Sequence, residues 1–158
     1  MSTKLEPAVI EAALRLAASV ASGLELDDPR LLATAREDSG FAAAIRVNDD
    51  QAIVALVTKE HDTWRPMKLQ QGVLLKGRGL LASGAGRWPG AEAPTWHWVF
   101  GRIEGDLRHP VMVRPGVRQP LEVGREGCFL GLHREPRASL HIETIQIDYD
   151  IDEAPGHT

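Results

Sequence analysis

The tripeptide Trp96-His97-Trp98 is the most unusual group of residues in this sequence that could bind a ligand. In an extended strand, successive side chains point to opposite faces, so Trp96, Trp98 and Phe100 share one face and His97 lies on the other. Two neighbouring indoles can stack on sugars or on unpaired bases. The same alternation also predicts an ordinary hydrophobic core, and both interpretations stay open at this point.

A thiol and several histidines are the other groups that could do chemistry. Cys128 is the only cysteine, and it could act as a nucleophile with His97 and with His133 or His141 if folding brings them together. Cys128 and His133 are separated by five positions, so on one continuous strand they would face opposite ways. Because two large apolar residues follow Cys128, the alternative is a buried small apolar side chain.

Metal motifs are not evident. Asp148, Asp150 and Asp152 alternate like the start of a calcium-binding loop, but Glu153 occupies the position that requires glycine. A solvated edge strand explains these acidic residues better. The histidines also lack zinc-binding spacing, so the sequence predicts neither a metal nor a cofactor.

Residues 77–82 contain a glycine pattern that occurs in nucleotide-binding proteins. The run Gly77-Arg-Gly-Leu-Leu-Ala82 matches a dinucleotide-binding fingerprint, which requires a helix directly after it. Further glycines follow at once at positions 84 and 86, so a helix is not expected and the match is weak.

The elements that would position these residues begin with a helical segment over residues 1–40. Thr3 and Glu6 have the spacing of a capping box, and apolar residues then recur at helical spacing as far as Val20. A second, short helix is predicted over Arg30 to Asp38, after a start signal at Asp27-Asp28-Pro29.

From residue 41 the pattern changes to that of strands. Turn signals recur about every ten residues, which is typical of an antiparallel sandwich or barrel. The expected strands lie at 41–47, 51–58, 64–70, 73–76, 80–81, 95–103, 111–114, 117–123, 128–134 and 140–151. The sequence thus predicts one α+β domain over 1–158, with helices 1–40 packed on a β-rich body 41–152 and a polar tail 153–158.

The segment 76–94 is rich in glycine and basic residues and contains Trp88. It is predicted to be mainly a long loop, apart from the short strand at 80–81, and loops of that length are often functional. We therefore expect a contact surface here, formed by Arg78, Arg87 and Trp88, with Trp96 and Trp98 as further candidate binding residues.

The last third of the chain resembles a known group of folds. The runs Val99-Phe-Gly-Arg-Ile103, Val111-Met-Val113, Leu121-Glu-Val123, Cys128-Phe-Leu130 and Ile145-Gln-Ile-Asp-Tyr149 are similar to strands of small immunoglobulin-like β modules in uncharacterised, often cell-envelope, bacterial proteins. The resemblance implies a fold and no activity, so no functional residue is transferred by it.

The net charge of −4 conceals an uneven distribution. Residues 1–64 carry a net charge of −5, residues 65–137 of +6, and residues 138–158 of −5. A basic middle between acidic ends could form an anion-binding face, or the segments could neutralise one another in the folded chain.

Together these patterns favour a bacterial, non-catalytic binding module whose partner is a protein or a second copy of the chain. A small enzyme with the Cys128–histidine site is one alternative. Binding of single-stranded nucleic acid through the basic, tryptophan-containing middle is another. A lone cysteine and the absence of an N-terminal apolar leader predict a cytoplasmic protein without a membrane partner.

Overall fold

The computed structural model describes residues 11–13, 15, 30–37, 40–60, 63–87, 95–103, 108–114, 116–135 and 146–151. In this part of the chain, three antiparallel sheets have the strand orders β1-β2-β3-β4, β5-β6-β9 and β10-β7-β8. In chain order the elements are β1 (Arg30–Glu37), β2 (Gly40–Arg46), β3 (Gln51–Glu60), β4 (Thr63–Leu74), β5 (Gly79–Arg87), β6 (Thr95–Arg102), β7 (Arg108–Arg114), β8 (Val117–Pro120), the 3-10 helix η1 (Arg125–Gly127), β9 (Cys128–Glu135) and β10 (Gln146–Ile151).

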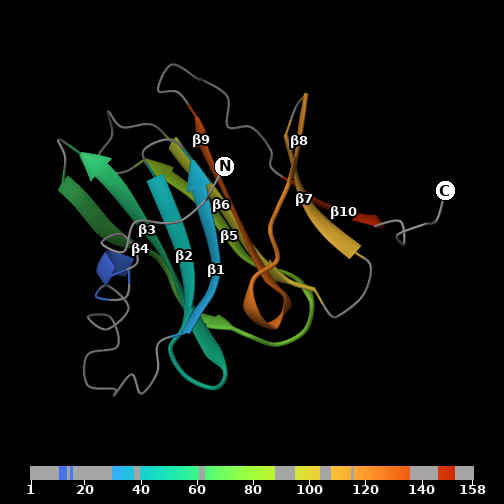
Figure 1. Ribbon diagram of the computed structural model, residues 1–158, viewed down its shortest axis with the longest axis horizontal. Helices are drawn as coiled ribbons and strands as arrows, with labels where there is room; N and C mark the ends of the chain where they lie inside the picture. The colour runs from blue at the N-terminus through green and yellow to red at the C-terminus, as the bar shows by residue number, and fades with distance from the viewer. Residues whose placement is uncertain are drawn as a thin grey trace.

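The first two sheets pack face to face as a sandwich (Figure 1). The core between them combines small side chains of the four-stranded sheet with large side chains of the β5-β6-β9 sheet. β2 and β3 supply Ala42, Ala44, Val54 and Leu56, among others. Opposite them lie the aromatic residues of β6 and the apolar residues of β9: Trp96, Trp98, Phe100, Cys128, Leu130 and Leu132.

Each sheet of the sandwich is also covered on its outer face. Phe41, Ile45 and Ile53 of β2 and β3 pack with the helical residue Ala13. On the other side, Val99 and Phe129 of β6 and β9 pack with residues of the third sheet, which Figure 1 shows beside the sandwich. β3 is therefore buried on both faces from residue 52 to 58, as its apolar sequence predicts.

The predicted α+β class is wrong, because the described chain is nearly all β. In the segment Arg30 to Asp38, expected to be a helix, the described residues Arg30–Glu37 form β1, which pairs antiparallel with β2. Pairing with β2 and contact with β9 bury Leu32 and Ala33, and this tertiary burial overrides a helical propensity that is only a weak bias. Of the first expected helix, residues 11–13 and 15 are described and helical, and the rest lies outside the described residues.

The expected loop 76–94 is also different, because Gly79 to Arg87 form β5. The glycines of β5 make room for β6 rather than breaking the strand. A Cβ atom at Gly84 would lie 2.9 Å from Nε1 of Trp98, which is the cross-strand neighbour of Gly84. Residues 88–94, including Trp88, lie outside the described part of the chain.

Candidate functional site

Basic side chains are concentrated on one side of the sandwich. β4 ends the four-stranded sheet and β5 ends the β5-β6-β9 sheet, and these two edge strands contact each other. Residues 63–87, which span both strands, include no acidic residue. The exposed basic residues of this segment are Arg65, Lys68, Lys76, Arg78 and Arg87, and we call this surface the β4–β5 side.

Two leucines on the β4–β5 side are unusually exposed. Leu74 is 55% exposed at the end of β4, and Leu80 is 51% exposed near the start of β5. Large apolar side chains among basic ones are a combination that suits contact with a polypeptide, which offers both apolar and charged groups.

The sequence predicted this surface only in part, because Arg65, Lys68 and Lys76 were not distinguished from the general excess of basic residues. The signal available was the run of 25 residues, 63–87, without an acidic residue.

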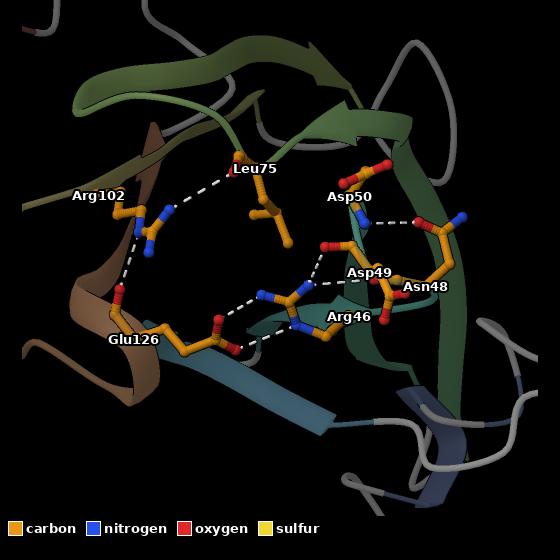
Figure 2. Close-up of polar contacts among 7 residues, drawn as sticks. All are labelled: Arg46, Asn48, Asp49, Asp50, Leu75, Arg102 and Glu126. Atoms are coloured by element: carbon orange, nitrogen blue, oxygen red, sulfur yellow. Dashed lines mark hydrogen bonds and ion pairs between the residues drawn. The ribbon is translucent and has the colours of Figure 1, made fainter.

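A network of arginine contacts holds the connection between β4 and β5 in place (Figure 2). Arg102 of β6 donates hydrogen bonds to the carbonyl of Glu126 at 3.0 Å and to the carbonyl of Leu75 at 3.5 Å. The Leu75 amide donates to the carbonyl of Asp50 at 2.8 Å. The chain therefore crosses from one sheet to the other at a fixed point, directly before Lys76.

The same network includes an ion pair that closes this end of the sandwich. Arg46 of β2 forms a two-pronged contact with the Glu126 carboxylate, in which Nε lies 3.1 Å from Oε2. Arg46 also donates to the carbonyl oxygens of Asn48 and Asp49, at 3.1 and 2.6 Å. One guanidinium thus links the β2–β3 turn to η1, as Figure 2 shows.

Trp96 and Trp98 are core residues and not contact residues. They are 2% and 3% exposed, and they pack between the two sheets with Phe100. The shared face predicted by strand alternation is correct, but it is the inner face, so neither indole can stack on a ligand. Of the other two tryptophans, Trp64 belongs to β4, and Trp88 lies outside the described residues.

The structure does bring two histidines together on the outer face of the β5-β6-β9 sheet. His97 of β6 and His133 of β9 are direct cross-strand partners, with stacked rings whose centroids are 6.0 Å apart. Nε2 of His97 lies 3.3 Å from Oε2 of Glu135, and both side chains are only 6% exposed. Arg87 approaches this group, since its Nε lies 3.4 Å from Oγ1 of Thr95, the cross-strand partner of Glu135.

Cys128 does not join the histidines. It pairs with Arg102 near the opposite end of β6, and its side chain lies in the inner core, on the other face of β9 from His133. Cys128 is 1% exposed, and this burial raises the pKa of its thiol from 9.0 to about 11, an effect that the nearby Arg102 guanidinium only partly offsets. The proposed Cys128–His97–His133 arrangement is therefore not assembled, and His141 lies outside the described residues.

We predict that iodoacetamide modifies Cys128 at least about a hundredfold more slowly in the native protein than in denaturant. Only the thiolate reacts, and each unit by which the pKa rises lowers the thiolate fraction about tenfold. Mass spectrometry of quenched samples would give both rates. Burial should slow the reaction further. A native rate close to the rate in denaturant would show a reactive thiol and revive the enzyme hypothesis.

The acidic and glycine motifs have structural roles here. Asp148 of β10 pairs with Arg118 of β8 at 3.1 Å across the third sheet. The backbone amide of Tyr149 and then this arginine lower the pKa of the Asp148 carboxyl below its usual value. Gly77 and Gly79 have φ angles of 79° and 95° and lead into β5, so no helix follows the dinucleotide-like fingerprint.

A shallow groove runs along the outer edge of β1. It consists of two cavities of about 240 and 180 Å³, which share Thr34 and Glu122 in their walls. The larger cavity is below the usual range for small-molecule sites, which starts at about 300 Å³. Its lining combines Arg36 and Gln119 with apolar residues of β9 and presents no convergent set of catalytic groups.

Within the described ranges, no group of three or more histidine, cysteine or acidic side chains is arranged to hold a metal ion. The same part of the chain contains no helix with the length and apolarity needed to cross a bilayer.

Comparison with protein-family models, with curated proteins and with solved structures gave no match.

Proposed function

We propose that this protein is a non-catalytic binding module that holds an acidic protein partner on its β4–β5 side. The observation that carries the proposal is the set of five exposed basic side chains on two adjoining edge strands, in a segment without an acidic residue. Opposite charge on a partner would steer its approach and select it against neutral or basic proteins.

A protein partner fits this side better than a nucleic acid does. Binding of single strands combines phosphate contacts with aromatic platforms for the bases. Of the tryptophans in the basic middle, the neighbouring pair Trp96 and Trp98 is buried in the core and cannot serve as such a platform. The exposed side chains of Leu74 and Leu80 instead offer apolar contact of the kind found at protein interfaces.

The proposal keeps two expectations from the sequence. A lone buried thiol suits the reducing cytoplasm, where we place this module. The likeness of the C-terminal third to immunoglobulin-like modules also remains a proposal, and packed antiparallel sheets are compatible with it.

Charge reversal tests the proposed function. The double variant Lys76→Glu/Arg78→Glu should weaken binding of a synthetic peptide of alternating glutamate and valine by about tenfold or more, because each reversal replaces attraction by repulsion. Fluorescence anisotropy of the labelled peptide at low and at physiological salt would measure this. Binding should also weaken as salt rises, since exposed charges are screened.

The matched control reverses two exposed arginines of β1 and η1 that do not belong to this side, in Arg36→Glu/Arg125→Glu, which changes the net charge equally. This control should bind the peptide much better than the Lys76/Arg78 variant. Equal losses of peptide affinity in the two variants would mean that only the net charge of the protein matters, and that the β4–β5 side is not the contact surface. Tighter binding of an oligothymidine than of the peptide would favour nucleic acid instead.

A further inference from the structure

We propose that an acidic, extended segment of the partner binds as an added strand along the outer edge of β5. This inference rests on the proposed function and deepens it, because it names the form in which the partner binds. Addition of a strand to a sheet edge is a recurring mode of peptide recognition, in which main-chain hydrogen bonds provide affinity.

The pairing of β5 leaves one of its edges available. β5 ends the β5-β6-β9 sheet, and among the described residues its only ladder partner is β6. A strand in that position presents alternate N–H and C=O groups outward. A partner strand could therefore continue the sheet without any change in β5.

The sequence of β5 lacks most of the devices that usually block an edge. It has nine residues, contains no proline and includes no charged residue before Arg87. Its exposed residues Ser83 and Ala85 are small, so a second backbone can approach closely. A register shift lies between Leu80 and Ala82, and the stretch from Ser83 to Arg87 is regular beyond it. Proteins commonly protect an exposed edge of this length with charge, proline or bulges, and β5 uses only the last of these, near its start.

The other edges of the described sheets are less suitable. On the outer edge of β1, Gly124 packs so closely that a Cβ atom on it would lie 2.2 Å from the carbonyl oxygen of Leu32. β4 contains an exposed Pro66, which cannot donate to a ladder. β8 and β10 have only four and six residues, and β9 packs against β1. β5 is therefore the longest edge in the described structure without such an obstacle.

Charge determines the kind of segment that fits. Lys76 and Arg78 precede β5 and Arg87 ends it, so basic residues lie at both ends of β5, and Arg87 also contacts Thr95 of β6. At about 3.3 Å per residue, an added strand of equal length would bring acidic residues at its own two ends close to them. A second copy of this chain would instead bring the same basic residues to the interface, and the repulsion disfavours self-pairing through β5.

Backbone methylation of the probe tests strand addition separately from charge. Two peptides, of equal length to β5 and alternating glutamate with valine, would carry N-methyl groups on alternate residues, one peptide on the even set and the other on the odd set. Only one set of amides can face β5 in a given register. We expect one methylated peptide to lose about tenfold or more in affinity and the other to bind almost as well as the unmethylated peptide.

Amide hydrogen exchange of the full chain, followed by NMR with the unmethylated peptide, provides the second readout. The peptide should slow exchange at alternate residues of β5, with a period of two, and leave the outer edge of β1 unchanged. These two results together would support the inference.

Other outcomes separate the inference from the function on which it rests. Salt-dependent peptide binding that is insensitive to both methylation patterns, with no slowed β5 amides, would overturn strand addition and leave the charged contact surface intact. Absence of peptide binding even at low salt would overturn both. A concentration-dependent dimer that protects β5 without peptide would show that a second copy is the occupant, and it would also overturn the inference.

Discussion

Replacing Gly127 by alanine is expected to lower the free energy of unfolding by about 3 kcal/mol or more. Gly127 has a φ angle of 75°, which favours glycine, and a Cβ atom there would lie 2.1 Å from the carbonyl oxygen of Ile103. The backbone must therefore move. That movement would also disturb the hydrogen bond that the Gly127 carbonyl accepts from the Ile103 amide at 2.8 Å. Equilibrium unfolding in urea would measure the loss.

Gly116 provides the matched control, because its φ angle of 74° is almost the same and a Cβ atom there would meet nothing within 4 Å beyond its chain neighbours. Gly116→Ala should cost about 1 kcal/mol, the penalty for the backbone conformation alone. The difference between the two variants then reports the contact between Gly127 and Ile103. Equal losses would show that η1 can shift away from β6 without penalty.

Replacing His97 by leucine is the second change with a large expected effect. It would leave the Glu135 carboxylate buried without the imidazole that lies 3.3 Å from it. Removing one partner of a buried polar contact, together with an imidazole that stacks on His133, typically destabilises a protein by about 2 kcal/mol. Thermal and urea unfolding would both detect a loss of this size, and the folded fraction of the variant should keep the β-sheet circular dichroism of the parent.

A double variant serves as the control for that prediction. His97→Leu/Glu135→Leu removes both partners, and it should recover a large part of the stability lost in His97→Leu, because two apolar side chains can replace a buried polar pair at little cost. Additive losses from the two single substitutions would mean that the contact between His97 and Glu135 contributes no coupling energy. The effect of His97→Leu would then be a packing effect.

The β-rich body could be predicted from sequence because its turn signals are local. Asn48-Asp49-Asp50 and Pro115-Gly116 separate strands whose pairing follows directly from the order of the chain. The helical assignment of Arg30 to Asp38 failed for the opposite reason. Its local composition suits a helix, and its strand form depends on β2 and on β9, which lies about a hundred residues further along.

The glycines of β5 show a similar limit. Read locally, Gly84 and Gly86 indicate a loop. Their role becomes visible only when β6 is placed beside them, since each is the cross-strand partner of a tryptophan. Prediction of this strand would have required the register between β5 and the strand that contains Trp96 and Trp98. No local sequence pattern contains that information.

The same difference between local and long-range information applies to the candidate site residues. Arg78 and Arg87 were expected to be contact residues from composition alone, and the structure leaves both exposed. The proximity of His97 to His133 could not be foreseen, because it depends on the register between two strands that are separated by two further strands in the chain. The failure of Cys128 to join them did follow from strand alternation.

The contact between β1 and β9 also has a consequence for how this protein is made. The strands β1 to β4 are neighbours in the chain, so their sheet can form as soon as that part has been synthesised. Its inner apolar face, which includes Val54 and Leu56, gains its full cover only when β9 has left the ribosome. A nascent chain that pauses before Cys128 therefore presents a half-built sandwich, and at that stage we expect chaperones to hold it.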